Sequence, residues 1–328
     1  MNAKKSASML DLYRTMRRIR EVELALAKLF ADSEVPGFIH LSIGQEGVAA
    51  GVMSALLPQD TVATTHRGHG HVLARGLDLD LFFREIMGKA GGICAGRGGS
   101  MHVSDMTLGI IGANGIVGAG IPIALGSALA HDTKGNKGIA VAFFGDGAMA
   151  EGVLHETMNL ASLWQLPLLL VCENNGWSEF SPTSRQFVAR LEALAAAFKL
   201  RYAHADGADA LAVAGVAASL AEGLRAGQGP AVFECTTKRV RGHYEGDPQK
   251  YRDPAELEAL CKFDPVVAGR LRLMDLGVEE SQVEELESQV LTEVKEAVER
   301  ARADTLPDFA EALRGVYGAA QPQSLRVA

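Results

Sequence analysis

Three continuous apolar runs alternate with helical patterns in the second half of the chain. The runs are GIAVAFFG at 138–145, PLLLVCE at 167–173 and GPAVFECTT at 229–237. A strand that is apolar throughout has to be covered on both faces, and alternation with helices is typical of parallel strands. These patterns therefore predict an α/β fold with three layers, in which a mostly parallel sheet has helices on both faces.

Apolar residues at helical spacing predict the elements that surround these strands. Helices are expected at 9–30, 42–57, 78–88, 122–133, 151–164, 190–200 and 210–227, and further helices dominate after residue 254. A short strand is expected at 61–66. Residues 91–121 carry many glycines with little periodicity, which predicts a long ordered loop of functional importance. In the helix at 151–164, Trp164 lies on the apolar face and is expected in the core.

The sequence between these elements indicates a single domain. No repeat and no low-complexity linker divides the chain, so we expect a single domain over 1–328, with an N-terminal helix and a C-terminal helical extension. The 48% apolar content is ample for one core of this kind.

Charge and cysteine usage exclude several classes of function. The formal net charge is −8 and no basic stripe is present, so nucleic acid is not an expected partner. Four cysteines, Cys94, Cys172, Cys235 and Cys261, are scattered without ligand-like spacing, which favours reduced thiols. No apolar run approaches the length of a membrane span, and the N-terminus lacks the pattern of a signal peptide. The expected location is the cytoplasm, without a membrane partner.

Polar residues follow two successive strands of the predicted sheet. Asp146 comes directly after the first apolar run, between Gly145 and Gly147, and Asn174 and Asn175 follow the second run. The carboxyl ends of parallel strands meet at one edge of a sheet, where ligands bind, so these side chains are expected to converge. A carboxylate and an amide oxygen form a hard site that suits Mg²⁺ or Ca²⁺ and not zinc, and phosphate oxygens normally complete the shell of Mg²⁺. The sequence therefore predicts a metal-bridged diphosphate.

The same stretch carries a family resemblance. GDGAMAEG followed by CENNGW looks like the thiamine-diphosphate fingerprint, in which a GDG motif precedes an NN pair by about thirty residues. Five further stretches occur in order: FIHLSIGQEGVAAG, THRGHGHVLARG, GGICAGRGGSMHV, GANGIVGAGIPIALG and RVRGHYEGDPQKYRDP. Together they resemble the α subunit of the E1 components of 2-oxo-acid dehydrogenase complexes over residues 9–260. The resemblance implies a thiamine-diphosphate-binding fold.

The resemblance also implies a role for individual residues. Asp146 and Asn175 would bind Mg²⁺ through their side chains, with the main-chain carbonyl of Trp177 as a third ligand. The implied cofactor contacts are Arg67, His66, Gly147 and Ala148 at the diphosphate, Gly115 and Val117 at the aminopyrimidine, and His40 and His243 as catalytic groups beside the thiazolium. A tyrosine stands at the His66 position in many relatives. The segment around His243 looks like the mobile active-site loop of the family.

Only half of a complete active site is covered by this resemblance. The family also uses a carboxylate from a pyrimidine-binding domain, and no second α/β unit is evident in the chain. The resemblance therefore implies an E1 β subunit that completes each site in an α₂β₂ heterotetramer. An E2 lipoyl acyltransferase is the further implied partner.

The substrate is expected to be acetoin. Pyruvate-using members of the family often have a serine where GHYEGDP has Tyr244, and ENNGWSEFSPTS is more similar to acetoin-cleaving members. The enzyme would cleave acetoin to acetaldehyde, and the hydroxyethyl group left on the cofactor would reductively acetylate the lipoyl group of E2. Decarboxylation of pyruvate by the same machinery is the alternative substrate hypothesis.

Two other classes of protein remain open at this point. GANGIVGAG resembles a dinucleotide-binding loop, which would suit an NAD-dependent dehydrogenase, although the motif is expected to precede its strand–helix units. A non-catalytic cofactor-binding or regulatory subunit would keep the same fold. The joint presence of Asp146, Asn175, Arg67 and His243 argues against the second of these.

Overall fold

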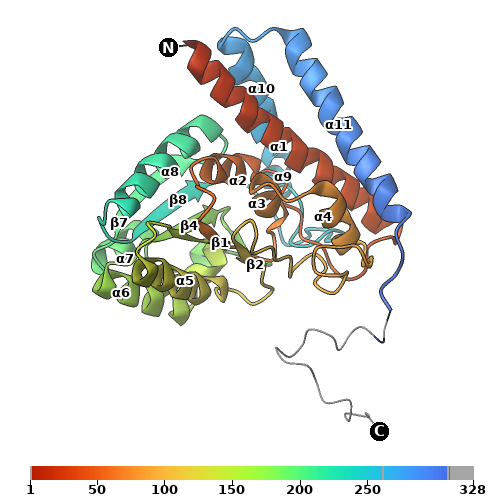
Figure 1. Ribbon diagram of the computed structural model, residues 1–328. Coiled ribbons are helices and arrows are strands. Elements are labelled where there is room, and N and C mark those ends of the chain that lie inside the picture. Colours follow the sequence, from red (N-terminus) through yellow and green to blue (C-terminus); the bar gives the residue numbers. More distant parts are fainter. Residues whose placement is uncertain (1, 261, 309, 311–328) are drawn as a thin grey trace.

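A six-stranded parallel sheet forms the centre of the molecule, in the order β2-β1-β3-β4-β8-β7. The computed structural model describes residues 2–260, 262–308 and 310 (Figure 1). The strands are β1 (Thr61–Ala63), β2 (Ile110–Gly112), β3 (Ala140–Gly145), β4 (Leu168–Asn174), β7 (Arg201–Asp206) and β8 (Ala231–Thr236). The predicted parallel α/β architecture is confirmed.

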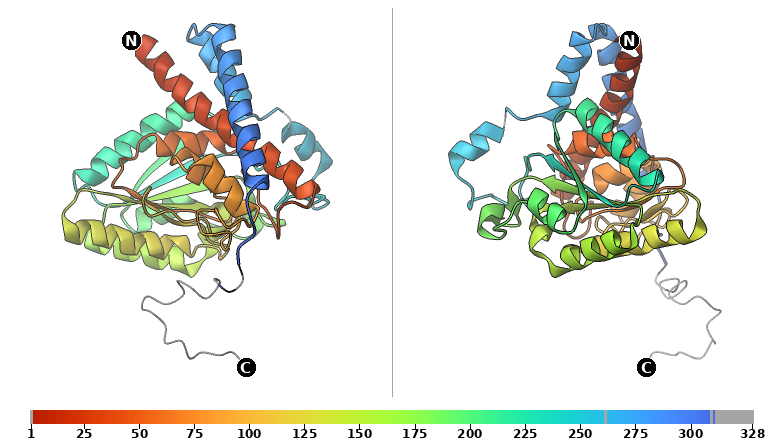
Figure 2. Two further views of the ribbon diagram at one scale, coloured as in Figure 1. Left: turned by 45° about the vertical axis from the view of Figure 1, so that its right-hand side comes forward. Right: turned by 90° about the vertical axis from the view of Figure 1, so that its left-hand side faces the viewer.

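Helices cover the two faces of the sheet with separate apolar clusters. On one face lie α5 (Gly120–Lys134), α6 (Gly152–Trp164) and α7 (Leu191–Ala197), and the opposite face carries α2 (Glu46–Met53) and α8 (Ala210–Arg225) (Figures 1 and 2). The inner side chains of β3 alternate between these clusters, with Phe144 on the α5 side and Phe143 on the α2 side. Both faces of the central strands are therefore buried, as their apolar sequences require.

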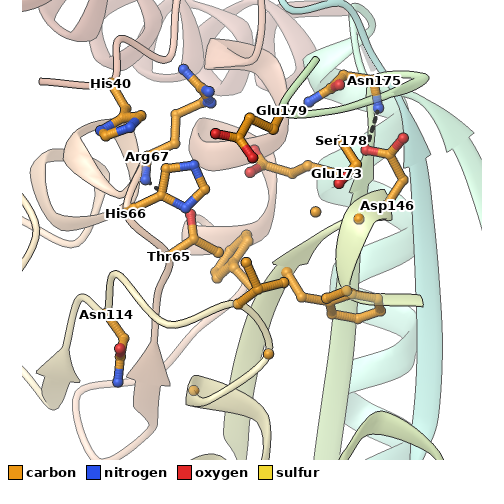
Figure 3. A pocket seen from close by; sticks show the side chains of 18 of the residues that line it. His40, Thr65, His66, Arg67, Asn114, Asp146, Glu173, Asn175, Ser178 and Glu179 are labelled. Carbon is orange, nitrogen blue, oxygen red and sulfur yellow. Dashed lines mark hydrogen bonds between the residues drawn. The ribbon is translucent and has the colours of Figure 1, made fainter. Parts of the chain in front are cut away.

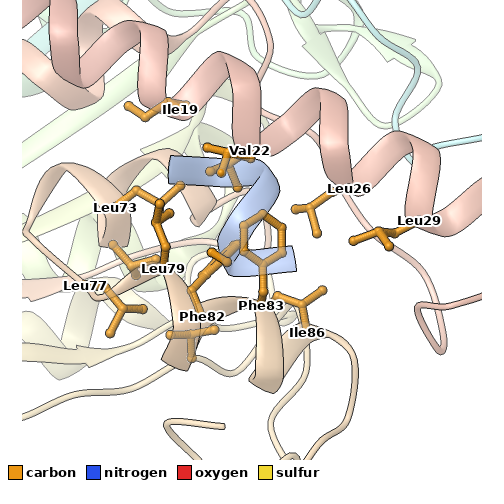
Figure 4. Packing of buried hydrophobic residues seen from close by; sticks show 14 of the residues in the cluster. Ile19, Val22, Leu26, Leu29, Leu73, Leu77, Leu79, Phe82, Phe83 and Ile86 are labelled. Carbon is orange, nitrogen blue, oxygen red and sulfur yellow. The ribbon is translucent and has the colours of Figure 1, made fainter. Parts of the chain in front are cut away.

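The terminal helices form a further layer beside α2 and α8. Helix α1 (Asn2–Ala31) runs along α10 (Pro265–Asp275) and α11 (Glu280–Arg302), and α4 (Leu79–Ile86) packs against α11. The buried side chains of α1, namely Ile19, Val22, Leu26 and Leu29, share one apolar cluster with Phe82, Phe83 and Ile86 of α4 (Figure 4). Two further short helices are α3 (His69–Ala74) and α9 (Pro254–Leu260).

The structure contains elements that sequence patterns did not predict. Strand β7 lies at an edge of the sheet, and its polar sequence RYAHAD gives no apolar run. Strand β2 is only three residues long and lies within the expected loop at 91–121. A small antiparallel hairpin joins β5 (Trp177–Ser178) to β6 (Ser181–Pro182). Edge and short strands bury little apolar surface, so hydrophobic periodicity does not reveal them.

Three smaller expectations were wrong. Strand β1 ends at Ala63, so His66 lies in the turn beyond it. Trp164 is 49% exposed, because α6 turns Leu154, Thr157, Met158 and Ala161 toward the sheet instead. The GANGIVGAG segment does follow a strand, since it connects β2 to α5.

The expectation of reduced thiols can be checked for three of the four cysteines. Cys94, Cys172 and Cys235 are free thiols, and Cys261 lies outside the described residues. None of the described helices combines the length and apolarity needed to cross a bilayer.

Two leucines of α6 test which face of this helix is buried. Leu154 is fully buried whereas Leu163 is 70% exposed. Leu154→Ala is expected to lower the free energy of unfolding by about 2–5 kcal/mol, because it leaves a cavity against the sheet. The matched change Leu163→Ala is expected to have an effect within about 0.5 kcal/mol. Urea unfolding of both variants measures the difference, and equal losses would contradict this orientation of α6.

Candidate active site

A cavity of about 310 Å³ lies at the carboxyl ends of β1, β3 and β4 (Figure 3). The chain leaves β1 toward β2 on one side and reaches β3 on the other, so the strand order reverses at this point. Open parallel sheets bind ligands at such a switch point. The residues predicted from the resemblance all line this cavity: His40, His66, Arg67, Gly115, Val117, Asp146, Gly147, Ala148, Asn175, Trp177 and His243.

Oxygen ligands occupy one end of the cavity. Register pairs Gly145 of β3 with Glu173 of β4, and this brings Asp146 close to Asn175. The main-chain N–H of Asn175 donates to Asp146 Oδ1 at 3.4 Å, and the Thr183 hydroxyl donates to the other oxygen. The Asn175 amide donates to Gln45 Oε1 at 3.1 Å and accepts from the Trp177 N–H at 3.1 Å. These contacts fix the orientation of both side chains.

Asp146 is almost completely buried, with 1% of its surface exposed. Burial raises the pKa of this carboxyl above its usual value, although the hydrogen bond from Thr183 opposes the shift. A carboxylate in such a place is costly to charge unless a cation approaches it. Carboxylate and amide oxygens are the donors that Mg²⁺ prefers, so this end of the cavity fits that ion.

The GDG turn is shaped by close packing as well as by the cavity. A side chain at Gly147 would place its Cβ 2.4 Å from the hydroxyl oxygen of Ser178 on β5, so only glycine fits there. A Cβ at Gly145 would meet nothing within 4 Å. The two glycines thus differ: Gly147 lets β5 close over the turn, whereas Gly145 leaves the neighbouring space free.

Arg67 brings a buried positive charge into the middle of the cavity. Its guanidinium donates to the carbonyl oxygens of Leu41 at 2.7 Å and His243 at 2.9 Å. Burial and the neighbouring Arg239 lower the pKa of Arg67 to about 10. The side chain is therefore charged at pH 7 but lies in an unfavourable potential.

Arg239 is a second buried cation in the same cavity, with 1% of its surface exposed. It donates to the carbonyl of Glu179 at 3.0 Å and to the Tyr251 hydroxyl at 2.9 Å, and its buried Nε has no hydrogen-bond partner among the residues that the structure describes. Within the described part of the chain, neither Arg239 nor Arg67 forms an ion pair with a carboxylate. Two unpaired buried cations with a free donor are suited to an anion such as a diphosphate. The sequence patterns did not identify Arg239 as part of the site.

Three histidine rings line the other end of the cavity. The His40 ring centroid lies 4.7 Å from that of His66 and 5.0 Å from that of His243. Burial, with Arg67 close by, lowers the pKa of His40 to about 3 and that of His243 to about 4, and burial holds the pKa of His66 well below its ordinary value. All three rings are consequently neutral at pH 7, so each can accept a proton or donate an N–H hydrogen bond.

A hydrogen-bond network holds His243 in place. Asp247 accepts from the main-chain N–H of His243 at 2.7 Å and from the Tyr251 hydroxyl at 2.5 Å. Tyr251 in turn accepts from Arg239, so the segment that carries His243 is tied to the buried cation. The segment at 238–254 is thus ordered against the cavity.

One buried carboxylate, that of Glu85, anchors the glycine-rich loop at 91–121, which was predicted to be ordered. Glu85 accepts main-chain N–H groups from four residues of the loop at 2.7–3.0 Å, namely Cys94, Gly96, Gly98 and Gly99. His69 links the loop to α1 by bonding Ser100 at 2.7 Å and Glu23 at 3.0 Å. This anchoring fixes the loop whose later part, with Gly115 and Val117, lines the cavity.

Glu173 is another cavity residue that sequence reasoning missed. It is 3% exposed and lies 3.2 Å from the His71 imidazole, whose second nitrogen bonds the Thr64 hydroxyl at 2.5 Å. The signal was present, since Glu173 is the one charged residue in the apolar run of β4. Its side chain supports the end of β1 from the next strand but one.

The amino-acid sequence matches one protein family and several known proteins. The family described as "Dehydrogenase E1 component" matches residues 14–309. The α subunit of acetoin:2,6-dichlorophenolindophenol oxidoreductase of Bacillus subtilis is 40% identical over 93% of this chain and 92% of that protein. The same subunit of Cupriavidus necator is 38% identical, over 94% of both chains. The pyruvate dehydrogenase E1 component subunit α of Zymomonas mobilis is 38% identical over 91% of this chain and 85% of that protein.

Asp146→Asn tests the electrostatic cost of the oxygen end. Burial raises the pKa of Asp146 in the folded protein above that of an aspartate in the unfolded chain, which is about 3.9. Folding therefore disfavours the charged form of this side chain at every pH above that value. The variant is therefore expected to be more stable than the wild type at pH 7 in the absence of ligands, by about 1 kcal/mol or more. This difference should vanish as the pH falls to about 3, where both side chains are neutral. Chemical denaturation at both pH values measures it; a variant that is less stable at pH 7 would contradict the argument.

Proposed function

Because the chain belongs to the dehydrogenase E1 component family, we propose that it is the α subunit of a thiamine-diphosphate-dependent acetoin dehydrogenase E1. The family consists of oxidoreductase components, and this chain is one of them. The proposed enzyme cleaves acetoin to acetaldehyde and transfers the remaining two-carbon unit, as an acetyl group, to the oxidised lipoyl group of E2, whose disulfide is reduced in the same step. The carrying observation is a single cavity that combines an oxygen metal site, two unpaired arginines and three neutral histidines.

The residues of the cavity fit the diphosphate of the cofactor. Arg67 and Arg239 would hold its oxygens, and Nε of Arg239 supplies a donor that has no acceptor among the described residues. Asp146 and Asn175 would bind a bridging Mg²⁺ through their side chains, with the Trp177 carbonyl as a third ligand. An anion and a cation arriving together relieve the burial cost of the arginines and of Asp146 at once.

Bound thiamine diphosphate supplies a carbon nucleophile that adds to the substrate carbonyl and accepts the electron pair released when the carbon–carbon bond breaks. The protein has to position the substrate and move protons at its oxygens. His40 and His243 are neutral at pH 7, so either can hydrogen-bond the carbonyl or take the hydroxyl proton of acetoin. The Arg67 and Asp247 contacts to the main chain of His243 keep this ring in the cavity.

A β subunit is the proposed partner that completes the site in an α₂β₂ assembly. Ile116 and Val117 belong to the cavity wall, yet 73% and 51% of their surfaces are exposed. Large apolar side chains at a binding site are rarely left in water, so a partner surface over them supports this arrangement. Gly115 and Val117 would then present their main chain to the aminopyrimidine between the two subunits. E2 and a cytoplasmic location are part of the same proposal, as is the treatment of 1–328 as one diphosphate-binding domain.

Acetoin is the proposed substrate and pyruvate is the alternative. Two relatives with acetoin in their names and one pyruvate dehydrogenase subunit have similar identities to this chain, so identity alone does not separate the substrates. The Tyr244 ring packs edge-on against Phe38 at 5.4 Å and lies 6.5 Å from the ring of His243, which lines the cavity. An aromatic pair beside this histidine suits the uncharged acetoin better than the carboxylate of pyruvate.

Loss of metal ligands should weaken cofactor binding in the assembled enzyme. With the β subunit present, Asn175→Ala is expected to reduce Mg²⁺-dependent affinity for thiamine diphosphate by about 100-fold, since one of few protein ligands is lost. His204→Asn, on the exposed side of β7, serves as the matched control and should bind normally. Isothermal titration with and without Mg²⁺ measures both, and unchanged binding by Asn175→Ala would refute the metal site.

Steady-state kinetics of the αβ enzyme test the substrate. With 2,6-dichlorophenolindophenol as electron acceptor, kcat/KM for acetoin is expected to exceed that for pyruvate by about tenfold or more. Tyr244→Phe should keep this preference because it keeps the apolar ring, whereas Tyr244→Ser should reduce it. A wild-type preference for pyruvate would overturn acetoin as the substrate while leaving the cofactor site untouched.

A further inference from the structure

Three imidazole rings converge at the end of the cavity away from Asp146. Figure 3 shows His40 and His66 beside Arg67, with Asp146 and Asn175 across the cavity. One nitrogen from each of His40, His66 and His243 lies within 4.8 Å of the other two. The cavity therefore has an oxygen-rich end and a nitrogen-rich end.

The separations of the rings fit a common metal ion. A zinc–imidazole bond of about 2.1 Å places the centroids of three rings around one tetrahedral ion about 5 Å apart. The observed centroid distances are 4.7 Å for His40–His66, 5.0 Å for His40–His243 and 5.5 Å for His66–His243. A shared ion requires that rotation of the side chains directs one lone pair of each ring at a common point, and the ligand atoms already lie within 4.8 Å of one another.

Two of the ring nitrogens lack a hydrogen-bond partner among the described residues. Nδ1 of His40 and Nδ1 of His243 are buried and form no hydrogen bond with any group in the described part of the chain, and only 7% of the His40 surface is exposed. Buried polar atoms nearly always have a partner. A ligand that binds both rings would supply it.

We propose that His40, His66 and His243 form a binding site for a transition-metal dication of the zinc class, distinct from the oxygen site for Mg²⁺. Neutral imidazole nitrogens favour zinc, copper and nickel, whereas carboxylate and amide oxygens favour magnesium. Three protein ligands leave a fourth position open, as in zinc sites that exchange small molecules. Sequence spacing gives no hint of this site, because its ligands come from three separate segments.

The neighbouring charges limit how tightly this site binds. Arg67 and Arg239 lie close to the rings and carry positive charge that opposes a dication. We therefore expect an anionic fourth ligand, such as hydroxide or chloride, and a dissociation constant on the order of micromolar, far weaker than that of a structural zinc site. If the proposed function holds, an ion here occupies the place of the reacting carbonyl and inhibits reversibly. The binding itself does not depend on that function.

A competition titration tests the site in the full chain. The metal-free protein is titrated with Zn²⁺ against a chromophoric chelator, in the presence of excess Mg²⁺. One equivalent of Zn²⁺ is expected to bind, and His66→Tyr or His243→Gln should weaken binding by about 100-fold or more, since even outer-shell partners of a metal are worth 10–100-fold. Asp146→Asn and His204→Asn are the matched controls and should bind Zn²⁺ like the wild type.

Cobalt spectroscopy gives a second readout that needs no variant to fold. Co²⁺ bound to the wild-type chain is expected to show the intense visible bands of a four-coordinate site, and Zn²⁺ should displace them. Weak six-coordinate bands, no binding at micromolar concentrations, or competition by Mg²⁺ would overturn the proposal. Equal zinc binding by the histidine variants and the wild type would also overturn it. Failure of thiamine diphosphate binding would leave these results unchanged, so the two proposals can fail separately.

Discussion

The register between β3 and β4 is the constraint on which the site depends. It pairs Gly145 with Glu173, so the residues that follow, Asp146 and Asn175, emerge side by side although 29 positions separate them. A shift of one residue would turn every inner side chain of these strands to the other face. Because both faces are packed by separate apolar clusters, that shift is prohibited. The core thus determines the position of the metal ligands.

The cavity is lined by charged groups whose burial works against folding. Asp146 is buried with a raised pKa, and burial together with Arg239 lowers the pKa of Arg67. Each group is destabilising in the free protein, and each matches a charge that a metal-bound diphosphate would bring. Such local conflict is expected at a binding site, where stability is given up for preorganisation. The surrounding core, including the α1–α4 cluster, compensates for it.

Apolar periodicity was sufficient to predict the sheet and the placement of Asp146, since continuous apolar strands leave few arrangements. It failed where burial is partial, as at edge strand β7 and at Trp164. The roles of His40 and His243 came from resemblance alone. Arg239 and Glu173 were missed because their roles depend on tertiary contacts. Each is buried beside residues that are distant in the sequence. Local patterns report which side chains are polar, but not which buried ones lack a partner.

Anomalous diffraction from the assembled αβ enzyme, crystallised with Mn²⁺ and thiamine diphosphate, tests the central claim most directly. The account predicts one manganese peak within bonding distance of the Asp146 carboxylate and the Asn175 amide oxygen, with diphosphate oxygens between the metal and Arg67 and Arg239. A diphosphate bound elsewhere, or a manganese ion that does not touch Asp146, would contradict it.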